Sequence, residues 1–298
     1  MSAQLDSIYE VARRSFLRAI RQPAAFVPAI VFPLFLVAVN SAGLDAATDL
    51  PGFPTDSYVT FALAIPFIQG GTFALLNTGT DVSTDVETGF MNRLAMTPLG
   101  GPSLLAGMLG GAMAIAVIQT VFYIAIGFVV GADFAAGIGG IPLLFLLSLT
   151  ISFAFSCIGT FTALRLGNSE AMQSMFPVFF VFLFFSSMAM PRDLIVQDWF
   201  RTVATINPLS YLIEGIRSFY VTGIDGEALA LAFAISALLI AVFLSLAAAS
   251  LRTTLVRTCP AWRARPPARR SGSGASPGRL PGAAPTTSSP TRRCSSRR

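Results

Sequence analysis

Side chains that could carry out chemistry are scarce in this sequence. It contains neither histidine nor lysine, so all 20 basic residues are arginine. A Ser-His-Asp triad and an imidazole metal site both need histidine. The phosphate-binding loop G-x-x-x-x-G-K-[ST] needs a lysine. We therefore expect no catalytic residue, no metal site and no ATP hydrolysis of that type in this chain.

The first segment with reactive side chains is the loop at residues 81–101. Its acidic residues Asp85 and Glu87 precede a short apolar stretch, Phe90–Met96, which ends just before Pro98. Acids at the start and a proline at the end favour a short helix on the cytoplasmic surface. The Phe and Met side chains would offer an adaptable contact for a partner. The alternative is an interfacial loop without a partner.

The second such segment, residues 191–226, is long for a connection. It contains two apolar stretches, 194–206 and 208–221, separated by the turn signal Asn207-Pro208. Each stretch is about half as long as a membrane span. We expect a short re-entrant helical hairpin here, with its broken backbone buried in protein.

Glu214 and Arg217 lie three residues apart in this second segment. At that spacing the two side chains can pair on one helix face. An ion pair is a cheaper way to hold charge near lipid than either group alone. We favour a structural pair over a substrate contact.

Six apolar segments must position these loops. Only 12% of the residues are charged, whereas a soluble domain carries roughly 25%. Lipid must therefore be the solvent for much of the chain, and about 20 residues of helix cross its core. We predict an all-α membrane protein with six transmembrane helices, at residues 23–40, 58–80, 102–130, 141–164, 171–190 and 228–250.

Charge divides the chain into three regions. Residues 1–22 read as an amphipathic interfacial helix with an arginine-rich face. Residues 23–251 form the six-helix domain. Residues 252–298 contain 11 arginines and no acids, and we expect this tail to be disordered. Its composition resembles out-of-frame translation; the alternative is a basic tail that binds anionic lipid.

Arginine placement predicts the orientation of the helices. Arginines lie in the N-terminal helix and after the second, fourth and sixth segments, which are all on one side if there are six crossings. Because positive residues stay inside, we place both termini in the cytoplasm. Polar residues within the spans could line a substrate path or form interhelical hydrogen bonds; they are Gln69, Asn77, Gln119 and Gln173.

Two stretches and the N-terminal helix carry a family resemblance over about residues 5–252. T-D-V-E-T-G-F-M-N-R-L-A-M-T-P-L (Thr84–Leu99) is similar to the loop after the second helix of the ABC-2 type permeases. A-M-P-R-D-L-I-V-Q-D-W-F-R-T-V-A-T-I-N-P-L-S-Y-L-I-E-G-I-R (Ala189–Arg217) resembles the run after their fifth helix. These permeases are membrane subunits of ABC exporters, and they include daunorubicin-resistance-type drug exporters. The tail after Arg257 has no counterpart in the family pattern.

The resemblance implies a half-transporter. A second permease subunit would complete it, as a homodimer or heterodimer, and a separate cytoplasmic ATPase subunit would bind ATP and Mg²⁺. Contact with that ATPase would involve Arg13, Arg14, Arg18, Asp85, Glu87, Gly89, Phe90, Arg93, Leu94 and Pro98. The outer re-entrant segment would contain Pro191, Trp199, Asn207, Pro208, Tyr211, Glu214 and Arg217.

We therefore expect an exporter permease in a bacterial inner membrane that moves a drug-like or lipid-like amphipathic molecule. A polysaccharide exporter of the same fold is one alternative. An ATP-independent carrier or channel is another, and a non-transporting membrane anchor or assembly factor is a third. The absence of an acidic residue in the middle of the predicted spans weakens a proton-coupled carrier.

Overall fold

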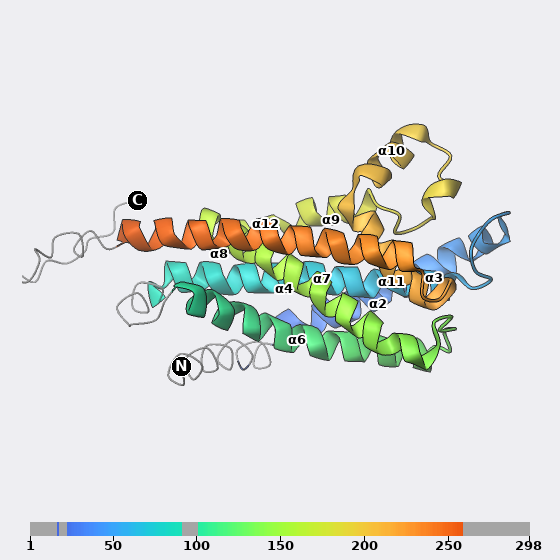
Figure 1. The fold of residues 1–298 in the computed structure, drawn as a ribbon, viewed down its shortest axis with the longest axis horizontal. Helices are drawn as coiled ribbons and strands as arrows, with labels where there is room; N and C mark the ends of the chain where they lie inside the picture. Colours follow the sequence, from blue (N-terminus) through green and yellow to red (C-terminus); the bar gives the residue numbers. More distant parts are fainter. Residues whose placement is uncertain (1–16, 18–22, 91–100, 259–298) are drawn as a thin grey trace, which may run out of the picture. The chain divides into compact units, whose positions relative to one another are not determined.

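A computed structural model of the chain describes residue 17, residues 23–90 and residues 101–258. All regular structure in these residues is helical, as predicted (Figure 1). The elements are α2 (Pro23–Leu44), η1 (Asp45–Asp49), α3 (Tyr58–Ala62), α4 (Ala64–Glu87), α6 (Gly101–Val129), α7 (Gly137–Leu166), α8 (Ser169–Ser174), α9 (Phe176–Phe184), η2 (Arg192–Leu194), α10 (Asp198–Ile206), α11 (Pro208–Val221) and α12 (Gly226–Thr258). Several predicted features lie outside the described residues, namely Arg13, Arg14, Arg18, Arg93, Leu94, Pro98 and residues 259–298 of the tail.

Five helical segments within the described ranges are long and apolar enough to cross a membrane. They are Val27–Asp49, Tyr58–Glu87, Leu105–Val129, Gly137–Leu166 and Gly226–Leu251. Five of the six predicted spans are thereby confirmed as long apolar helices. Six crossings are not confirmed, because the predicted fifth span does not form one long helix.

That fifth segment, residues 171–190, is divided between α8 and α9. Pro177 lies in the first turn of α9 and has no N–H to donate to the carbonyl four residues earlier. The regular helix therefore breaks between Ser174 and Phe176, and it ends again at Phe184. The segment is apolar on both sides of the break, so only the proline in the sequence signals where the helix is interrupted.

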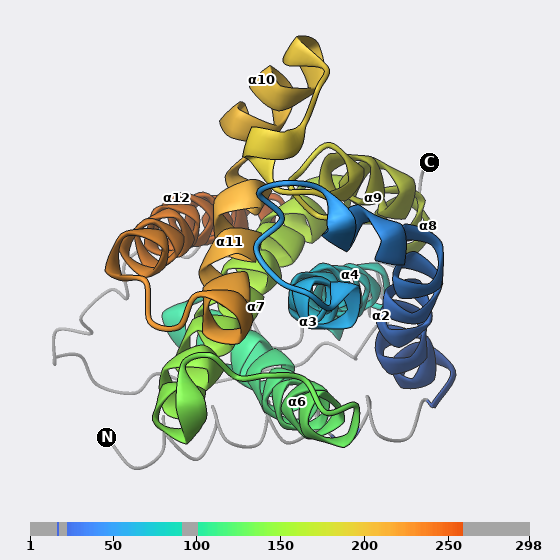
Figure 2. The ribbon, with the colours of Figure 1, turned by 90° about the vertical axis from the view of Figure 1, so that its right-hand side faces the viewer.

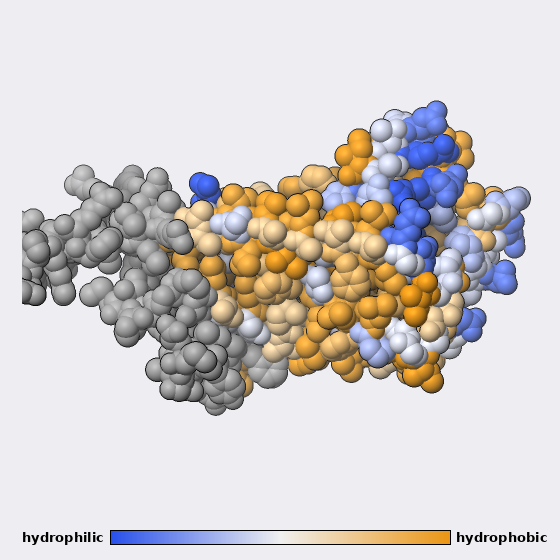
Figure 3. Space-filling model, in the orientation of Figure 1, coloured by the Kyte–Doolittle hydropathy of each residue, from blue (hydrophilic) through white to orange (hydrophobic). Residues whose placement is uncertain are grey.

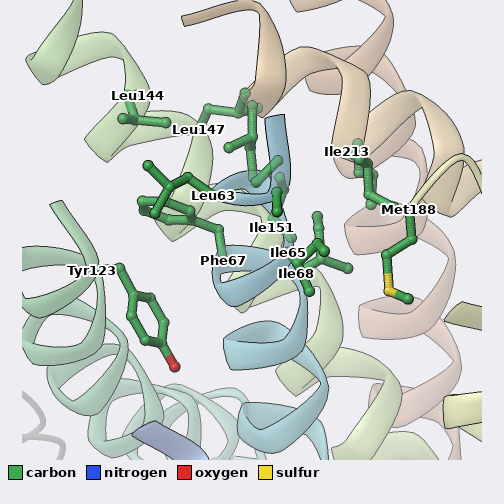
Figure 4. Close-up of a cluster of buried hydrophobic side chains, with 14 of the residues drawn as sticks. Leu63, Ile65, Phe67, Ile68, Tyr123, Leu144, Leu147, Ile151, Met188 and Ile213 are labelled. Atoms are coloured by element: carbon green, nitrogen blue, oxygen red, sulfur yellow. The ribbon is translucent and has the colours of Figure 1, made fainter. Parts of the chain in front are cut away.

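Helix α4 forms the centre of the bundle. In the most apolar part of the Tyr58–Glu87 segment, which is mainly α4, 83% of the residues are buried, compared with 17% in the corresponding parts of Val27–Asp49 and Gly226–Leu251. It contacts α2, α6, α7, α8, α9 and α11, and Figure 2 shows it surrounded by neighbouring helices. Figure 4 shows the side chains that fill this core, among them Leu63, Phe67, Tyr123, Leu147 and Ile151.

Helices α4 and α7 approach each other very closely at Gly159. A Cβ atom added to Gly159 on α7 would lie 2.2 Å from the carbonyl oxygen of Leu75 on α4. Only a residue without a side chain permits this approach. The missing side chain of Gly159 therefore sets the distance between α4 and α7.

Helix α4 is longer than the predicted second span. It continues to Glu87 rather than ending near Thr80, so Asp85 and Glu87 belong to its last turns and not to a loop. The extension is stabilised by a second apolar cluster, in which Val82 packs with residues of α6, α7 and α12. The remainder of the predicted surface helix, after Phe90, falls in residues 91–100, outside the described part.

The helices define two ends of the bundle. At one, called here the α11 end, α11 packs against α3, α4, α7 and α12. At the other, called the Glu87 end, α4 finishes beside the start of α8. The chain begins α8 at Ser169, at the Glu87 end, and by Ser187 it has reached Ser210 of α11. Residues 169–187 thus pass from one end to the other.

The surface is apolar along the helices and polar at the α11 end. Figure 3 shows hydrophobic residues along the length of the helices on one face, with hydrophilic residues gathered around α10 and its neighbours. Large exposed apolar side chains occur on α2, α6, α9 and α12. This pattern is expected where lipid replaces water around the helices.

Candidate functional site

Asn207 determines where α11 begins. Its side-chain oxygen accepts a hydrogen bond from the N–H of Leu209 at 3.0 Å, and Pro208 occupies the first helical position. Its Nδ2 group donates to the carbonyls of Phe182 at 2.7 Å and Phe185 at 2.9 Å. The predicted Asn207-Pro208 helix start is confirmed, and the same amide ties α11 to the end of α9.

Arg217, on α11, lies at the meeting point of three segments. It is 6% exposed, and its Nε donates to the carbonyl of Phe61 at 3.3 Å. Its Nη2 donates to the carbonyls of Ser187 and Met188, both at 3.0 Å. The guanidinium carbon is 3.5 Å from the centre of the Phe61 ring. We call these four residues the Arg217 junction.

The junction holds a buried charge by means of main-chain dipoles and an aromatic face. Such contacts compensate for water lost on burial. Burial lowers the pKa of Arg217 to about 9, while the nearby charge of Glu214 raises it. The side chain therefore stays protonated at neutral pH.

A helix break supplies part of this site. Helix α3 ends at Ala62 and α4 starts at Ala64, because Pro66 cannot donate a hydrogen bond to the carbonyl of Ala62. Arg217 binds the adjacent carbonyl, that of Phe61. Tyr58 adds a second tie, since its hydroxyl donates to the carbonyl of Ala189 at 2.8 Å.

The predicted pair between Glu214 and Arg217 is wrong. Glu214 instead accepts a hydrogen bond from Arg192 Nη2 at 2.5 Å, and the Arg192 guanidinium lies 4.5 Å from the centre of the Tyr211 ring. Arg217 is turned into the bundle, where carbonyls bind it. Glu214 lies on the partly exposed side of α11 that faces η2. A spacing of three residues permits a pair between Glu214 and Arg217, but the packed helices bring other groups closer to each of them.

The predicted re-entrant hairpin is not confirmed. Helix α11 is packed among the bundle helices, whereas α10 contacts η2 and α11 and stands to one side of the bundle in Figures 1 and 2. Trp199 on α10 is 60% exposed and takes no part in the Arg217 junction. Pro191 immediately precedes η2.

At the opposite end, Glu87 joins α4 to α8. Its carboxylate accepts hydrogen bonds from the Ser169 N–H at 2.8 Å and from the Ser169 hydroxyl at 3.1 Å. Asn168 caps the same helix, and Gly167 ends α7 in the left-handed conformation. We call Glu87, Asn168 and Ser169 the Glu87 junction. Gly167-Asn168 is a stop-and-start signal that the sequence analysis did not use.

The other described residues of the predicted partner contact surround this junction in sequence. Asp85 is buried on α4, Gly89 has a φ of +67°, and Phe90 is half-buried. The structure therefore places these residues at the Glu87 end, together with Glu87.

The four candidate pathway residues differ in how deeply they are buried. Gln69 on α4 is 1% exposed and Gln119 on α6 is 3% exposed. Within the described part of the chain, neither amide atom of Gln69 has a hydrogen-bond partner, nor has the Gln119 nitrogen. Asn77 is half-buried, and Gln173 is exposed on α8. Within the residues that the structure describes, no group of three or more Cys, Asp or Glu side chains could hold a metal ion.

Comparison with known proteins adds three similarities. The sequence model of the ABC-2 type transporter family matches residues 6–221. The chain is 28% identical over 219 residues to ycf38 of Porphyra purpurea, a protein named as a transport permease, covering 72% of this chain and 74% of that protein. It is 26% identical over 201 residues to the daunorubicin resistance ABC transporter permease protein DrrB1 of Streptomyces coeruleorubidus, covering 63% of this chain and 67% of that protein.

Proposed function

The chain belongs to the ABC-2 type transporter family, and we propose that it is the permease subunit of an ATP-driven exporter. Its energy would come from ATP hydrolysis on a separate cytoplasmic ATPase subunit. The sequence supports this division, because it lacks the lysine with which a phosphate-binding loop grips ATP.

One structural observation carries the coupling proposal. The α3–α4 segment runs through the centre of the bundle with a polar junction at each end. At one end the Glu87 junction ties it to α8, and at the other the Arg217 junction ties it to α11. A displacement of the Glu87 end therefore has a continuous, tightly packed path to the α11 end.

The ATPase would bind at the Glu87 end. Its contacts would include the described residues Asp85, Glu87, Gly89 and Phe90, together with the basic N-terminal helix and the segment after Phe90. A second permease subunit would complete the transporter. Both chain termini would then lie in the cytoplasm of a bacterium, and the α11 end would face outward.

Six crossings fit this orientation. The α8–α9 segment is only 16 residues long, Ser169–Phe184, or about 24 Å of helix. It nevertheless begins at the Glu87 end and runs toward the α11 end, and the chain beyond Phe184 completes the passage by Ser187. A short broken helix is acceptable in a membrane where neighbouring protein satisfies its backbone.

The substrate would be an amphipathic drug-like or lipid-like molecule. Gln69 and Gln119 support this choice, because their buried amides offer hydrogen bonds without a formal charge. The name of DrrB1 points to export of a drug of the daunorubicin kind.

Flux in inside-out membrane vesicles tests the proposal. The chain is produced with and without an ABC ATPase subunit, and ATP-dependent accumulation of daunorubicin is measured by fluorescence. We expect accumulation only with both subunits and ATP, and association of the subunits on purification. Flux that needs no ATPase would instead establish an ATP-independent carrier.

A further inference from the structure

Helix α10 carries an apolar stripe that the bundle does not cover. Trp199, Val203 and Ile206 are spaced by four and three residues and so share one side of the helix. They are 60%, 39% and 76% exposed. The opposite parts of the helix carry Asp198 and Arg201.

We propose that this stripe lies in the lipid headgroup region at the α11 end, so that α10 is an interfacial anchor and not one arm of a re-entrant hairpin. An apolar side opposite a charged side is the pattern of a helix lying in the membrane plane. Tryptophan is also one of the two residues enriched at this boundary. The inference rests on membrane embedding alone and does not require coupling to ATP.

Contacts on the inner side of α10 orient the helix so that the stripe points away from the bundle. Ala204 is buried, and Phe200 packs against Phe185 with ring centres 6.1 Å apart. Arg201 donates through Nε to the carbonyl of Ile195 at 3.0 Å, which fixes its charged group away from the stripe. The helix is therefore held in one rotational setting by contacts on its other sides.

The stripe is continuous with the apolar surface of the bundle. Trp199 packs edge-on against Phe185, with ring centres 6.4 Å apart, and Phe185 directly follows α9. Val181, Phe182 and Phe184 of α9 are themselves exposed. Figure 3 shows hydrophobic residues on the side of this region turned toward the apolar length of the bundle, with hydrophilic residues beyond them. Lipid that covers α9 would therefore meet the stripe of α10.

Tryptophan fluorescence offers a direct test. The sequence has two tryptophans, so a Trp262→Phe variant leaves Trp199 as the only one. The full chain is reconstituted in phosphatidylcholine vesicles that carry bromine at shallow or deep acyl positions, and iodide is added as the aqueous quencher. An interfacial helix sits about 5–10 Å below the headgroup boundary, so we expect shallow bromines to quench more than deep ones and iodide to quench little.

A matched variant moves the indole around the helix. Trp199→Phe and Thr205→Trp in the same background place the probe on the exposed polar side, where we expect iodide to quench and brominated lipid to have little effect. If that variant does not fold, Val203→Asp in the Trp262→Phe background should reduce quenching of Trp199 by brominated lipid.

Two results would overturn the inference. Strong quenching of Trp199 by iodide, without quenching by brominated lipid, would place the stripe in water. Protection from both quenchers would show that protein covers it, either a second copy or another subunit.

Discussion

Arg217 donates a hydrogen bond to the carbonyl of Phe61, 156 residues earlier in the chain, and its guanidinium also lies 3.5 Å from the centre of the same residue's ring. The Arg217 side chain thus contacts both the backbone and the ring of Phe61, beside the break between α3 and α4. The consequence is a fixed position for α11 relative to the central helix.

Arg217→Lys should destabilise the protein and abolish transport. Lysine keeps the charge but lacks the planar fork that reaches three carbonyls. Buried carbonyls left unpaired would lower the free energy of unfolding by about 2 kcal/mol or more. Thermal unfolding in detergent measures this loss. Arg165→Lys, at the exposed end of α7, is the control, and equal melting temperatures for the two variants would contradict the prediction.

The Arg192–Glu214 ion pair should contribute much less. Both side chains are partly exposed, and pairs of this kind contribute about 0–1 kcal/mol. A double-mutant cycle with Arg192→Ala and Glu214→Ala should give a small coupling energy that falls with added salt. A coupling energy as large as the effect of Arg217→Lys would show that the pair is a principal support of the α11 end.

Gly159→Ala should be harmful although it adds a single methyl group. The new Cβ would lie 2.2 Å from a backbone oxygen of Leu75, so no side-chain rotation can relieve the clash. Overpacking of this kind costs about 1–3 kcal/mol. Gly139→Ala, on the same helix with nothing within 4 Å, is the matched control and should be neutral or slightly stabilising. Similar melting temperatures for both variants would disprove the close α4–α7 contact.

Glu87→Ala should weaken the coupling of α4 to α8. The carboxylate caps the start of α8 through Ser169, and loss of a cap of this type costs about 1 kcal/mol at an exposed site. We expect ATP-dependent export to fall. Ser169→Ala removes only the hydroxyl contact and should have a smaller effect. If Glu87 acts through this junction, adding Ser169→Ala to Glu87→Ala should cause no further loss of flux; additive losses would speak against the junction.

Gln69→Leu should raise thermal stability and lower transport together. A buried amide without a partner costs about 1–3 kcal/mol, so replacing it by an apolar side chain removes that cost. If Gln69 lines the proposed substrate path, loss of its amide also removes a hydrogen-bonding group for the substrate. Asn77→Leu, at a half-buried position, is the comparison. Higher stability with unchanged daunorubicin flux would remove Gln69 from the pathway.

Much of the fold could be predicted from local sequence. Runs of apolar residues located five long helices and placed the start of each within four residues, because lipid requires every spanning backbone to form its own hydrogen bonds. The start of α11 at Asn207-Pro208 was equally local. The end of the second span was misplaced because Val82 is stabilised by residues of three distant helices.

The sequence by itself determined that the chain lies in lipid and that it cannot grip ATP with a phosphate-loop lysine, since both follow from residue types alone. Tertiary structure decided which charges meet. Arg217 and Glu214 are only three residues apart in the sequence. Arg217 nevertheless binds carbonyls of α3 and of the segment after α9, whereas Glu214 binds Arg192. Spacing along a helix fixes only the direction of a side chain. Its partner depends on which distant segment the packed core brings to that side.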